Sequence, residues 1–241
     1  MIKFFRKIRQ KMLTENKFSK YLFYAAGEVI LVVIGILIAL QINNWNEQRK
    51  VDGEILKTLT EIRSNLISDS LGISETRILK AEDINIQYRV IKELESRNIP
   101  YDSIEYHLGR VMLARRIVLV DNGYQLMKKF GLELLKNQEL RNELINYYTN
   151  STKKINDDTA DDEFEFRTVF LPYIRHHFLD FDWSKRGVPS DYEHLMSDQY
   201  FLTTLKANIK NEESTLEALE NGAKKIQEIL PILDKTVLSY E

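Results

Sequence analysis

Residues 21–42 read YLFYAAGEVILVVIGILIALQI and contain one ionisable side chain, Glu28, and one amide, Gln41. At about 1.5 Å per residue, a helix of this length spans roughly 33 Å, enough to cross a hydrocarbon core about 30 Å thick. The run continues into Asn43 without the small residues of a cleavage site, so we interpret it as an uncleaved signal anchor. The sequence predicts a transmembrane helix over residues 21–42.

Aromatic side chains stand at both ends of this predicted span. Tyr21 and Tyr24 lie at its start and Trp45 lies just beyond its end, positions typical of interfacial anchors. Seven Lys or Arg occur in the first 20 residues, whereas three occur in the fifteen residues after the span. The positive-inside rule then places the N-terminus in the cytoplasm and residues 43–241 outside the cytoplasmic membrane, in the periplasm of a cell with two membranes.

The first 20 residues combine a net charge of +6 with apolar side chains at helical spacing. We expect residues 1–20 to form a basic amphipathic cytoplasmic segment on anionic lipid, and a solvated basic tail is the alternative. The whole chain carries −2, so residues 21–241 carry −8. Because contact with phosphates needs a basic face, this acidic body argues against nucleic acid as a partner.

Glu28 lies about a third of the way into the span, where a carboxylate costs on the order of a few kcal/mol. Three interpretations stay open: snorkelling toward the cytoplasmic surface, a hydrogen bond across an oligomer interface, and proton or ion conduction by several copies. Gly35 and Ala39 form a pair of small residues four apart, which lets two helices approach closely. We therefore expect a homo-oligomer through the membrane helix, with contacts at Glu28, Gly35 and Ala39.

The apolar residues of 43–241 mostly follow helical spacing, which predicts an all-α fold. Ile55, Leu59, Ile62 and Leu66 form a seam that can continue the membrane helix outward, and a second helical run covers about 74–97. Further helices are expected near 102–116, from Asn137 as N-cap to about 171, and from about 197 or 198 to 238, with 178–191 as the longest loop. The simplest architecture is a transmembrane helix followed by an extramembrane antiparallel helical bundle.

No motif for phosphate, dinucleotide or zinc binding occurs, and the chain has no cysteine. We therefore expect no catalytic residue, no cofactor and no metal ligand. The alternative is a metal-assisted hydrolase that uses the adjacent His176 and His177 with nearby carboxylates. Adjacent residues diverge by about 100° on a helix, so these two histidines need partners from elsewhere to share a metal.

Two further clusters lie between residues 157 and 183. The six carboxylates of the first, Asp157, Asp158, Asp161, Asp162, Glu163 and Glu165, lack the loop spacing of an EF-hand, and we interpret them as a solvated helix face. The second cluster holds seven aromatic residues between Phe164 and Trp183. Most are expected in the core, and the remainder line a pocket or a partner-binding surface. Any recognition site is expected there.

Residues 16–47, NKFSKYLFYAAGEVILVVIGILIALQINNWNE, resemble the signature of a bacterial family of single-span membrane proteins of unknown function. Residues 131–148, GLELLKNQELRNELINYY, resemble a second block of that family, although Phe130 stands where a small polar residue is common. The resemblance implies a membrane-anchored helical protein and brings no catalytic or binding residues with it. Together with the residue patterns, it suggests a noncatalytic module that binds a partner protein or ligand, or scaffolds an assembly, outside the membrane.

Overall fold

A computed structural model of the chain describes residues 18–97, 101–111 and 113–240, with side chains from residue 22 onward except those of residues 101 and 102. The predicted basic segment 1–20 therefore lies largely outside the described residues, as does the side chain of Tyr21. The chain forms two compact units, Met1–Glu54 and Ile55–Glu241.

Helix α2 (Phe18–Ser96) provides the whole described part of the first unit. Nearly all its side chains from Leu22 to Ile42 are exposed, although the most apolar 18-residue stretch of this helix has a mean hydropathy of 2.5. The helix is long and apolar enough to cross a membrane, which is compatible with a single-pass anchor.

The two helical runs predicted on either side of residue 70 belong to this same helix. No proline interrupts residues 18–96, and Gly53 and Gly72 are isolated glycines, each of which costs roughly 1 kcal/mol without breaking a helix. The predicted separation into two runs was therefore wrong, whereas the helical state of both was confirmed.

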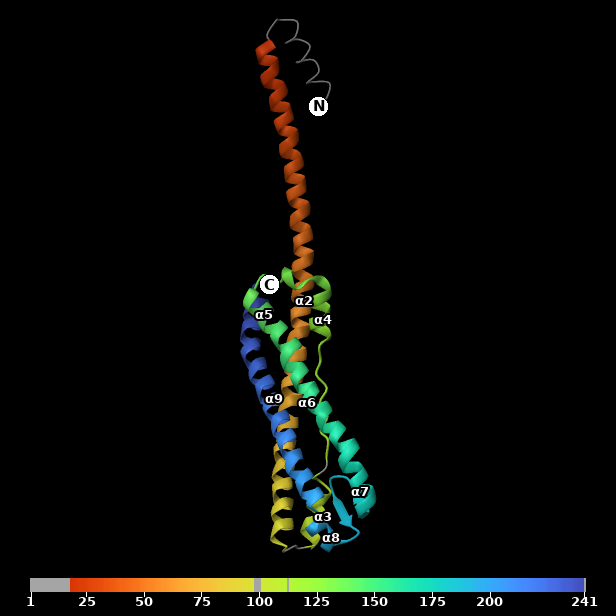
Figure 1. Ribbon diagram of the computed structural model, residues 1–241. Helices are drawn as coiled ribbons and strands as arrows, with labels where there is room; N and C mark the ends of the chain where they lie inside the picture. The colour runs from red at the N-terminus through yellow and green to blue at the C-terminus, as the bar shows by residue number, and fades with distance from the viewer. Residues whose placement is uncertain (1–17, 98–100, 112, 241) are drawn as a thin grey trace. The chain divides into compact units, whose positions relative to one another are not determined.

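The regular elements of the second unit are helices apart from one two-stranded hairpin among its described residues, and residues 113–121 form an irregular segment (Figure 1). After α2 come α3 (Tyr101–Leu108), α4 (Asn122–Phe130), the short 3-10 helix η1 (Leu132–Leu134), α5 (Gln138–Asn146), the π-helix η2 (Tyr147–Ser151), α6 (Thr152–Glu165), the π-helix η3 (Phe166–Phe170), α7 (Leu171–His177), β1 (Phe178–Asp182), β2 (Arg186–Pro189), α8 (Tyr192–Ser197) and α9 (Gln199–Leu238).

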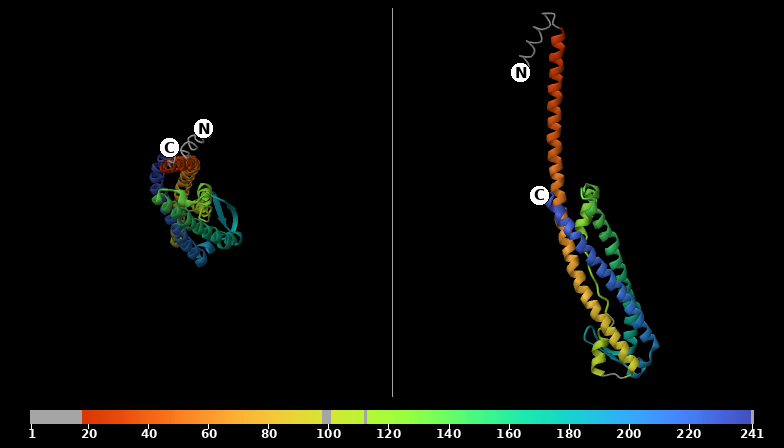
Figure 2. Two further views of the ribbon diagram at one scale, coloured as in Figure 1. Left: turned by 90° about the horizontal axis from the view of Figure 1, so that it is seen from above. Right: turned by 90° about the vertical axis from the view of Figure 1, so that its left-hand side faces the viewer.

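In the second unit, α2, α6 and α9 lie side by side (Figure 2). Arg63 near one end of this part of α2 pairs with Asp234 at 2.6 Å, and Glu95 near the other end pairs with Lys206 at 2.7 Å. Helix α9 therefore runs antiparallel to α2. Its contacts with α6 also run in opposite order, so α6 is parallel to α2.

The helical run predicted from Asn137 to about residue 171 is present and extends to His177. Asn137 is the N-cap as expected, since its side chain accepts a hydrogen bond from the Leu140 N–H at 3.1 Å. Pro172 does not end the run, because it occupies the first turn of α7, where its missing N–H is tolerated. Two π-helices, η2 and η3, interrupt the α-helical run without ending it.

Residues 178–191, expected as a loop, contain the hairpin. Phe181 lies opposite Gly187, and an irregularity between Phe178 and Asp180 shifts the register. A Cβ on Gly187 would lie 3.0 Å from the Phe181 ring, so the glycine allows the ring to cover the partner strand. The two strands have only five and four residues, which is too short for the sequence pattern to predict that they pair.

Buried apolar side chains form two groups in the second unit. The group at the end where α2 enters includes Ile55, Leu59, Ile62, Leu66, Met127, Leu135, Leu140, Leu144, Ile226, Ile229 and Leu233. The group at the opposite end includes Ile84, Val90, Leu94, Ile104, Leu108, Phe170, Tyr173, Ile174, Leu195, Phe201, Leu205 and Ile209. The predicted seam of α2 from Ile55 to Leu66 is therefore confirmed as core.

Between these groups the buried face of α2 is mostly polar, although Ile73 is also fully buried there. It carries Asn65, Asp69, Thr76, Lys80, Asp83 and Gln87, all buried. Asp69 accepts hydrogen bonds from the Tyr147 hydroxyl at 2.7 Å and from the Val120 N–H at 2.8 Å. Asn208 of α9 donates to Gln87 at 2.9 Å. The polar groups thus pair across helices instead of facing water.

One member of the acidic run 157–165 belongs to this buried layer. Lys153 and Lys154 pair with Asp157 and Asp158 one turn later, as expected of a solvated face. Asp162, however, is 3% exposed and lies 2.7 Å from Lys80 of α2. The interpretation of the whole run as a solvated face was therefore wrong for Asp162, because α6 turns this residue toward α2.

Candidate functional site

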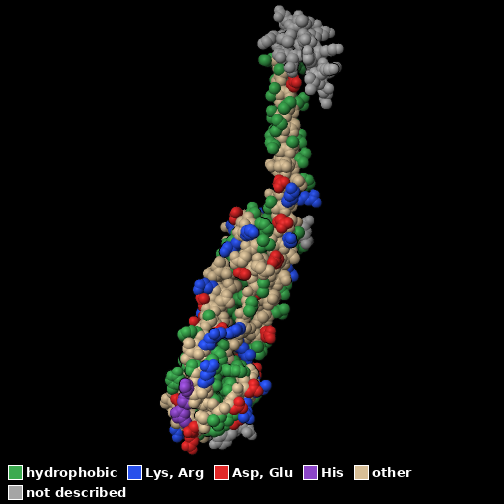
Figure 3. All heavy atoms as spheres, turned by 90° about the vertical axis from the view of Figure 1, so that its right-hand side faces the viewer, with side chains coloured by type: hydrophobic (Ala, Val, Ile, Leu, Met, Phe, Trp, Pro, Cys, Tyr) green, Lys and Arg blue, Asp and Glu red, His purple; other side chains and the backbone are tan. Residues whose placement is uncertain are grey.

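The elements α3, α7, the hairpin, α8 and the start of α9 meet at one end of the second unit (Figure 1). Aromatic and imidazole side chains gather there. We call this region the cap. Figure 3 shows histidine side chains at this end beside a patch of hydrophobic ones. The cap includes most of the aromatic stretch that the sequence singled out as a recognition site.

Backbone contacts hold the hairpin against α3. Gly109, just after α3, accepts a hydrogen bond from the Ser184 N–H at 2.8 Å. A Cβ at Gly109 would lie 2.4 Å from the Arg186 nitrogen, so only glycine permits this approach. At the other end of the hairpin, the Ser190 N–H and hydroxyl both donate to the His177 carbonyl, at 2.8 and 3.0 Å. The hairpin is therefore fixed on both sides.

Two aspartates start the helices that follow the hairpin. Asp191 accepts hydrogen bonds from the N–H groups of Glu193 and His194 and caps α8. Asp198 caps α9 in the same way and also accepts from the Tyr173 hydroxyl at 2.7 Å. Burial raises the pKa of Asp198, but its hydrogen bonds outweigh this effect, so the pKa lies below its ordinary value. Asp198 is thus an ionised anchor that joins α7 to α9.

Tyr173 lies at the centre of the cap. Its ring stacks on Phe201 at 4.8 Å between centroids and on His177 at 4.3 Å, and Tyr200 lies 6.1 Å away. Burial raises the pKa of the Tyr173 hydroxyl, which therefore stays protonated and donates to Asp198. The stack places imidazole and phenol edges at the surface.

A hollow of about 440 Å³ opens beside this stack. It is lined by Thr168, Val169, Pro172, Tyr173, His176, His177, His194, Asp198 and Tyr200. Its walls are aromatic and apolar, with imidazoles and one carboxylate at the rim. This composition suits a flat or apolar group with a hydrogen-bonding edge.

Two of the three histidines of the hollow stack on each other. His177 stacks on His194 with ring centroids 5.4 Å apart, and His194 Nε2 lies 3.9 Å from an Asp198 oxygen. His176 is exposed and lines the same hollow. Within the described ranges, no three His, Cys, Asp or Glu side chains converge on a common point. The geometry therefore does not favour the hydrolase alternative.

Exposed apolar side chains also lie on the hairpin and at the end of α6. Phe164 is 69%, Leu179 75% and Trp183 43% exposed. Trp183 packs edge-on against Phe166, and both line a second hollow of about 410 Å³ with Arg116 and Arg167. The expectation that most aromatics of this stretch are core is confirmed, since Phe170 and Tyr173 are buried and three others pack against the core partly buried, namely Phe166, Phe178 and Phe181. The exposed Phe164 and Trp183 give this region an apolar surface.

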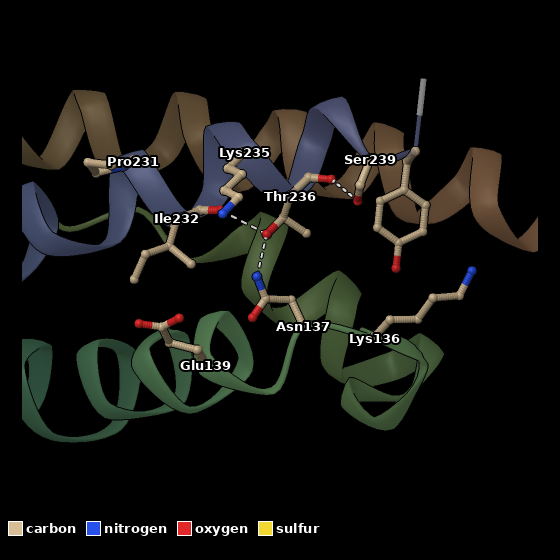
Figure 4. A pocket seen from close by; sticks show the side chains of 9 residues that line it. Lys136, Asn137, Glu139, Pro231, Ile232, Lys235, Thr236 and Ser239 are labelled. Atoms are coloured by element: carbon tan, nitrogen blue, oxygen red, sulfur yellow. Dashed lines mark hydrogen bonds between the residues drawn. The ribbon is translucent and has the colours of Figure 1, made fainter.

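A third hollow, of about 430 Å³, lies between the start of α5 and the end of α9 (Figure 4). Asn137 Nδ2 donates to the Thr236 hydroxyl at 2.7 Å, and Ser239 donates to the Thr236 carbonyl at 2.6 Å. Lys136 lies over the Tyr240 ring, 5.3 Å from its centroid. These polar groups bind one another, so their arrangement is explained by the joining of α5 to α9.

The predicted membrane and oligomer residues all lie in the first unit. Tyr24 and Trp45 are 62% and 65% exposed, and Glu28, Gly35 and Ala39 are also exposed. A Cβ added at Gly35 would meet nothing within 4 Å. The face that carries Gly35 is therefore open in the single chain, as close approach by another helix requires.

Sequence reasoning missed His194, Asp198 and Tyr200 as parts of the cap hollow. The available signal was the placement of Asp191 and Asp198 directly before helices, which is typical of N-caps. That signal locates the helix starts, but it does not show that Tyr173 and His177 lie against them.

A family described as a family of unknown function (DUF6090) matches residues 28–112. The match covers the C-terminal part of the predicted span, the rest of α2 and α3, which supports assignment to an uncharacterised family. Neither the curated proteins nor the solved structures gave a significant match.

Proposed function

We propose that this protein is a membrane-anchored, noncatalytic module whose helical bundle binds a partner protein outside the cytoplasmic membrane. In this proposal residues 21–42 span the membrane, the N-terminus is cytoplasmic, and the cap is the binding surface. The observations that carry it are an exposed apolar helix in the first unit and, in the second, a hollow lined by aromatic side chains together with exposed apolar side chains on the hairpin.

The anchor is supported by solvation. Exposed Leu, Ile and Val side chains along 21 consecutive residues, from Leu22 to Ile42, are unfavourable in water and favourable in hydrocarbon. The excess of Lys and Arg before this stretch supports the N-in orientation. Open space around Gly35 supports self-association of the span. In this proposal Glu28, Gly35 and Ala39 form the contact between copies.

The cap is supported as the binding surface by its chemistry. A partner segment with an apolar or aromatic side chain can fill the hollow beside Tyr173, and the exposed Leu179 and Trp183 of the hairpin region offer further apolar contacts. His194 and Tyr200 can supply hydrogen bonds at the edge. Fixed hairpin backbone and two capped helices hold this surface in place before binding, which lowers the entropy lost on association.

Site-specific photo-crosslinking in intact cells tests the proposal. A photoreactive amino acid replaces Leu179 in the cap, and in a matched control it replaces Val118, which is also apolar and is 85% exposed. We expect a discrete adduct from position 179 and none from 118, and loss of that adduct on Tyr200→Ala. Equal adducts from both positions, or an adduct unaffected by Tyr200→Ala, would contradict the cap as binding surface.

Orientation has its own test. A fluorescent protein that matures only in the cytoplasm, fused after Glu241, should stay dark, while the same reporter fused before Met1 should be bright. The reverse result would overturn the N-in topology and with it the extracytoplasmic placement of the bundle.

A further inference from the structure

Lys80 lies at the centre of the second unit, inside a group of ionisable side chains from three helices. Its ammonium nitrogen lies 2.7 Å from Asp162 Oδ2 of α6 and 3.3 Å from Glu212 Oε2 of α9. The three side chains are 0 to 3% exposed. The Thr215 hydroxyl donates to the same Asp162 oxygen at 2.8 Å. We call Lys80, Asp162 and Glu212 the buried triad.

The triad lacks partners for two of its oxygens. Asp162 Oδ1 and Glu212 Oε2 are buried and accept no well-formed hydrogen bond from any described residue, although the Lys80 ammonium lies 3.3 Å from Glu212 Oε2. With both carboxyl groups ionised, the triad would carry a net charge of −1 away from water. Such a buried net charge is strongly unfavourable unless something neutralises it.

A metal ion does not suit this place. The Lys80 ammonium already occupies the space between the two carboxylates and would repel a second cation at contact distance. No further ligand group converges there among the described residues. A proton needs no coordination shell, and on a carboxyl oxygen it converts an orphan acceptor into a donor.

We propose that the buried triad is a proton-binding site, in which Glu212 takes up one proton from solvent as the second unit folds. The carboxylate of Glu212 becomes a neutral carboxyl group, and Lys80 and Asp162 remain as a compensated ion pair. Loss of this proton leaves the net charge buried and weakens the contact of α9 with α2 and α6.

The surrounding groups favour this placement of the proton. Asp83 of α2 lies near Glu212 and adds negative charge, although its own oxygens are held by Arg115 at 2.6 and 3.0 Å. Glu165, one turn after Asp162 on α6, accepts a hydrogen bond from Asn211 of α9. Burial first, and then the nearby Asp162 and Asp83, raise the pKa of Glu212 from 4.5 to about 7, with Lys80 opposing them.

Because the pKa of Glu212 is higher in the folded chain than in the unfolded chain, the stability of the fold depends on pH. Between about pH 4.5 and 7 the unfolded chain has lost the Glu212 proton while the folded chain retains it. The contribution of Glu212 to stability is therefore complete below pH 4.5, falls as the pH rises, and is flat above pH 7. Each pH unit inside this window lowers the folding equilibrium constant up to about tenfold.

Urea unfolding of the full chain in detergent micelles tests the proposal with Glu212→Gln, since glutamine imitates the neutral carboxyl group. Far-UV circular dichroism follows the folded fraction between pH 5 and pH 8. We expect the ratio of folding constants, variant over parent, to rise about 100-fold from pH 5 to pH 8. Glu217→Gln, an exposed change on the same helix, should keep a ratio that does not depend on pH.

A ratio for Glu212→Gln that stays constant with pH would overturn the proposal, because a purely structural role predicts the same loss at every pH. Carbon-13 NMR of labelled glutamate carboxyls supplies a measurement that does not depend on the folding of this variant. In a Glu28→Gln background, one glutamate should titrate near pH 7. Titration of every glutamate below about pH 6 would also overturn it.

Discussion

Two stretches of α2 show opposite relations between polarity and exposure. From Leu22 to Ile42 the side chains are almost all apolar and exposed, whereas on the inner face from Asn65 to Gln87 many are polar and buried. The backbone is the same α-helix in both. What differs is the surroundings that make each stretch stable: hydrocarbon suits the first, and paired polar groups from α6, α9 and η2 complete the second.

This contrast shows that polarity along a helix does not by itself tell which face is inside. In the second unit, apolar residues make the core at both ends. Between the ends, hydrogen bonds and ion pairs join the helices beside a few buried apolar side chains, Ile73, Ile155 and Leu219. Such pairs contribute little net stability over an apolar core, but they penalise any shift of α6 or α9 that separates the partners. We infer that the polar layer sets the register of the three helices.

The largest effect is expected from Lys80→Met, which removes the positive charge of the buried triad and keeps most of the side-chain volume. It leaves Asp162 and Glu212 buried without their cation, so it should lower the free energy of unfolding by about 3–5 kcal/mol. Urea unfolding at pH 8 measures this loss. Lys206→Met is the control: it removes a half-exposed ion pair with Glu95 and should cost less than about 1 kcal/mol. If both variants lose the same free energy of unfolding, burial does not make the Lys80 ion pairs more important than the exposed pair.

A charge in the apolar stretch should have the next largest effect. Val32→Asp places a carboxylate near the middle of residues 22–42 and should disfavour membrane insertion by roughly 3 kcal/mol. The share of the protein that resists alkaline extraction from membranes measures insertion, with Val32→Leu as the control. If the aspartate variant is retained as fully as the leucine variant, this stretch is not a membrane span.

Tyr147→Phe should give a smaller loss in the polar layer. It removes the hydroxyl that donates to Asp69 at 2.7 Å, leaving that buried carboxylate with the Val120 N–H, and should cost about 2 kcal/mol. Burial already raises the pKa of Asp69, and loss of the hydrogen bond raises it further. The loss should therefore be greater at pH 8 than at pH 5. Tyr88→Phe, which removes an exposed bond to Glu213, should change stability much less at either pH.

The smallest effect concerns self-association of the first unit. Glu28→Gln should weaken association only slightly, since hydrogen bonds between membrane helices average about 0.6 kcal/mol. Gly35→Leu should weaken it more, because bulk at the contact separates the two backbones. Energy transfer between full-length copies in bilayers measures association, and Leu37→Ile is a neutral control. If both variants associate like the parent, Glu28 is better explained by snorkelling.

Much of the local structure could be predicted from the sequence. Four predictions were correct: the apolar stretch, the helical spacing of Ile55 to Leu66, the N-cap residue Asn137 of α5, and the start of α9 near Asp198. The hairpin was missed because its pairing joins two short strands without an alternating pattern. Asp162 was misplaced because its neighbours along the chain are indeed solvated.

The sequence by itself determined where the apolar helix lies, that the rest is helical, and where several helices start. These properties depend on side chains a few residues apart. Only the tertiary structure decided that Lys80 meets Asp162, 82 residues later, and that Tyr173, His177, His194 and Asp198 share one hollow. A charged side chain has the same local pattern whether it faces water or a partner, since its burial depends on which helix packs against it.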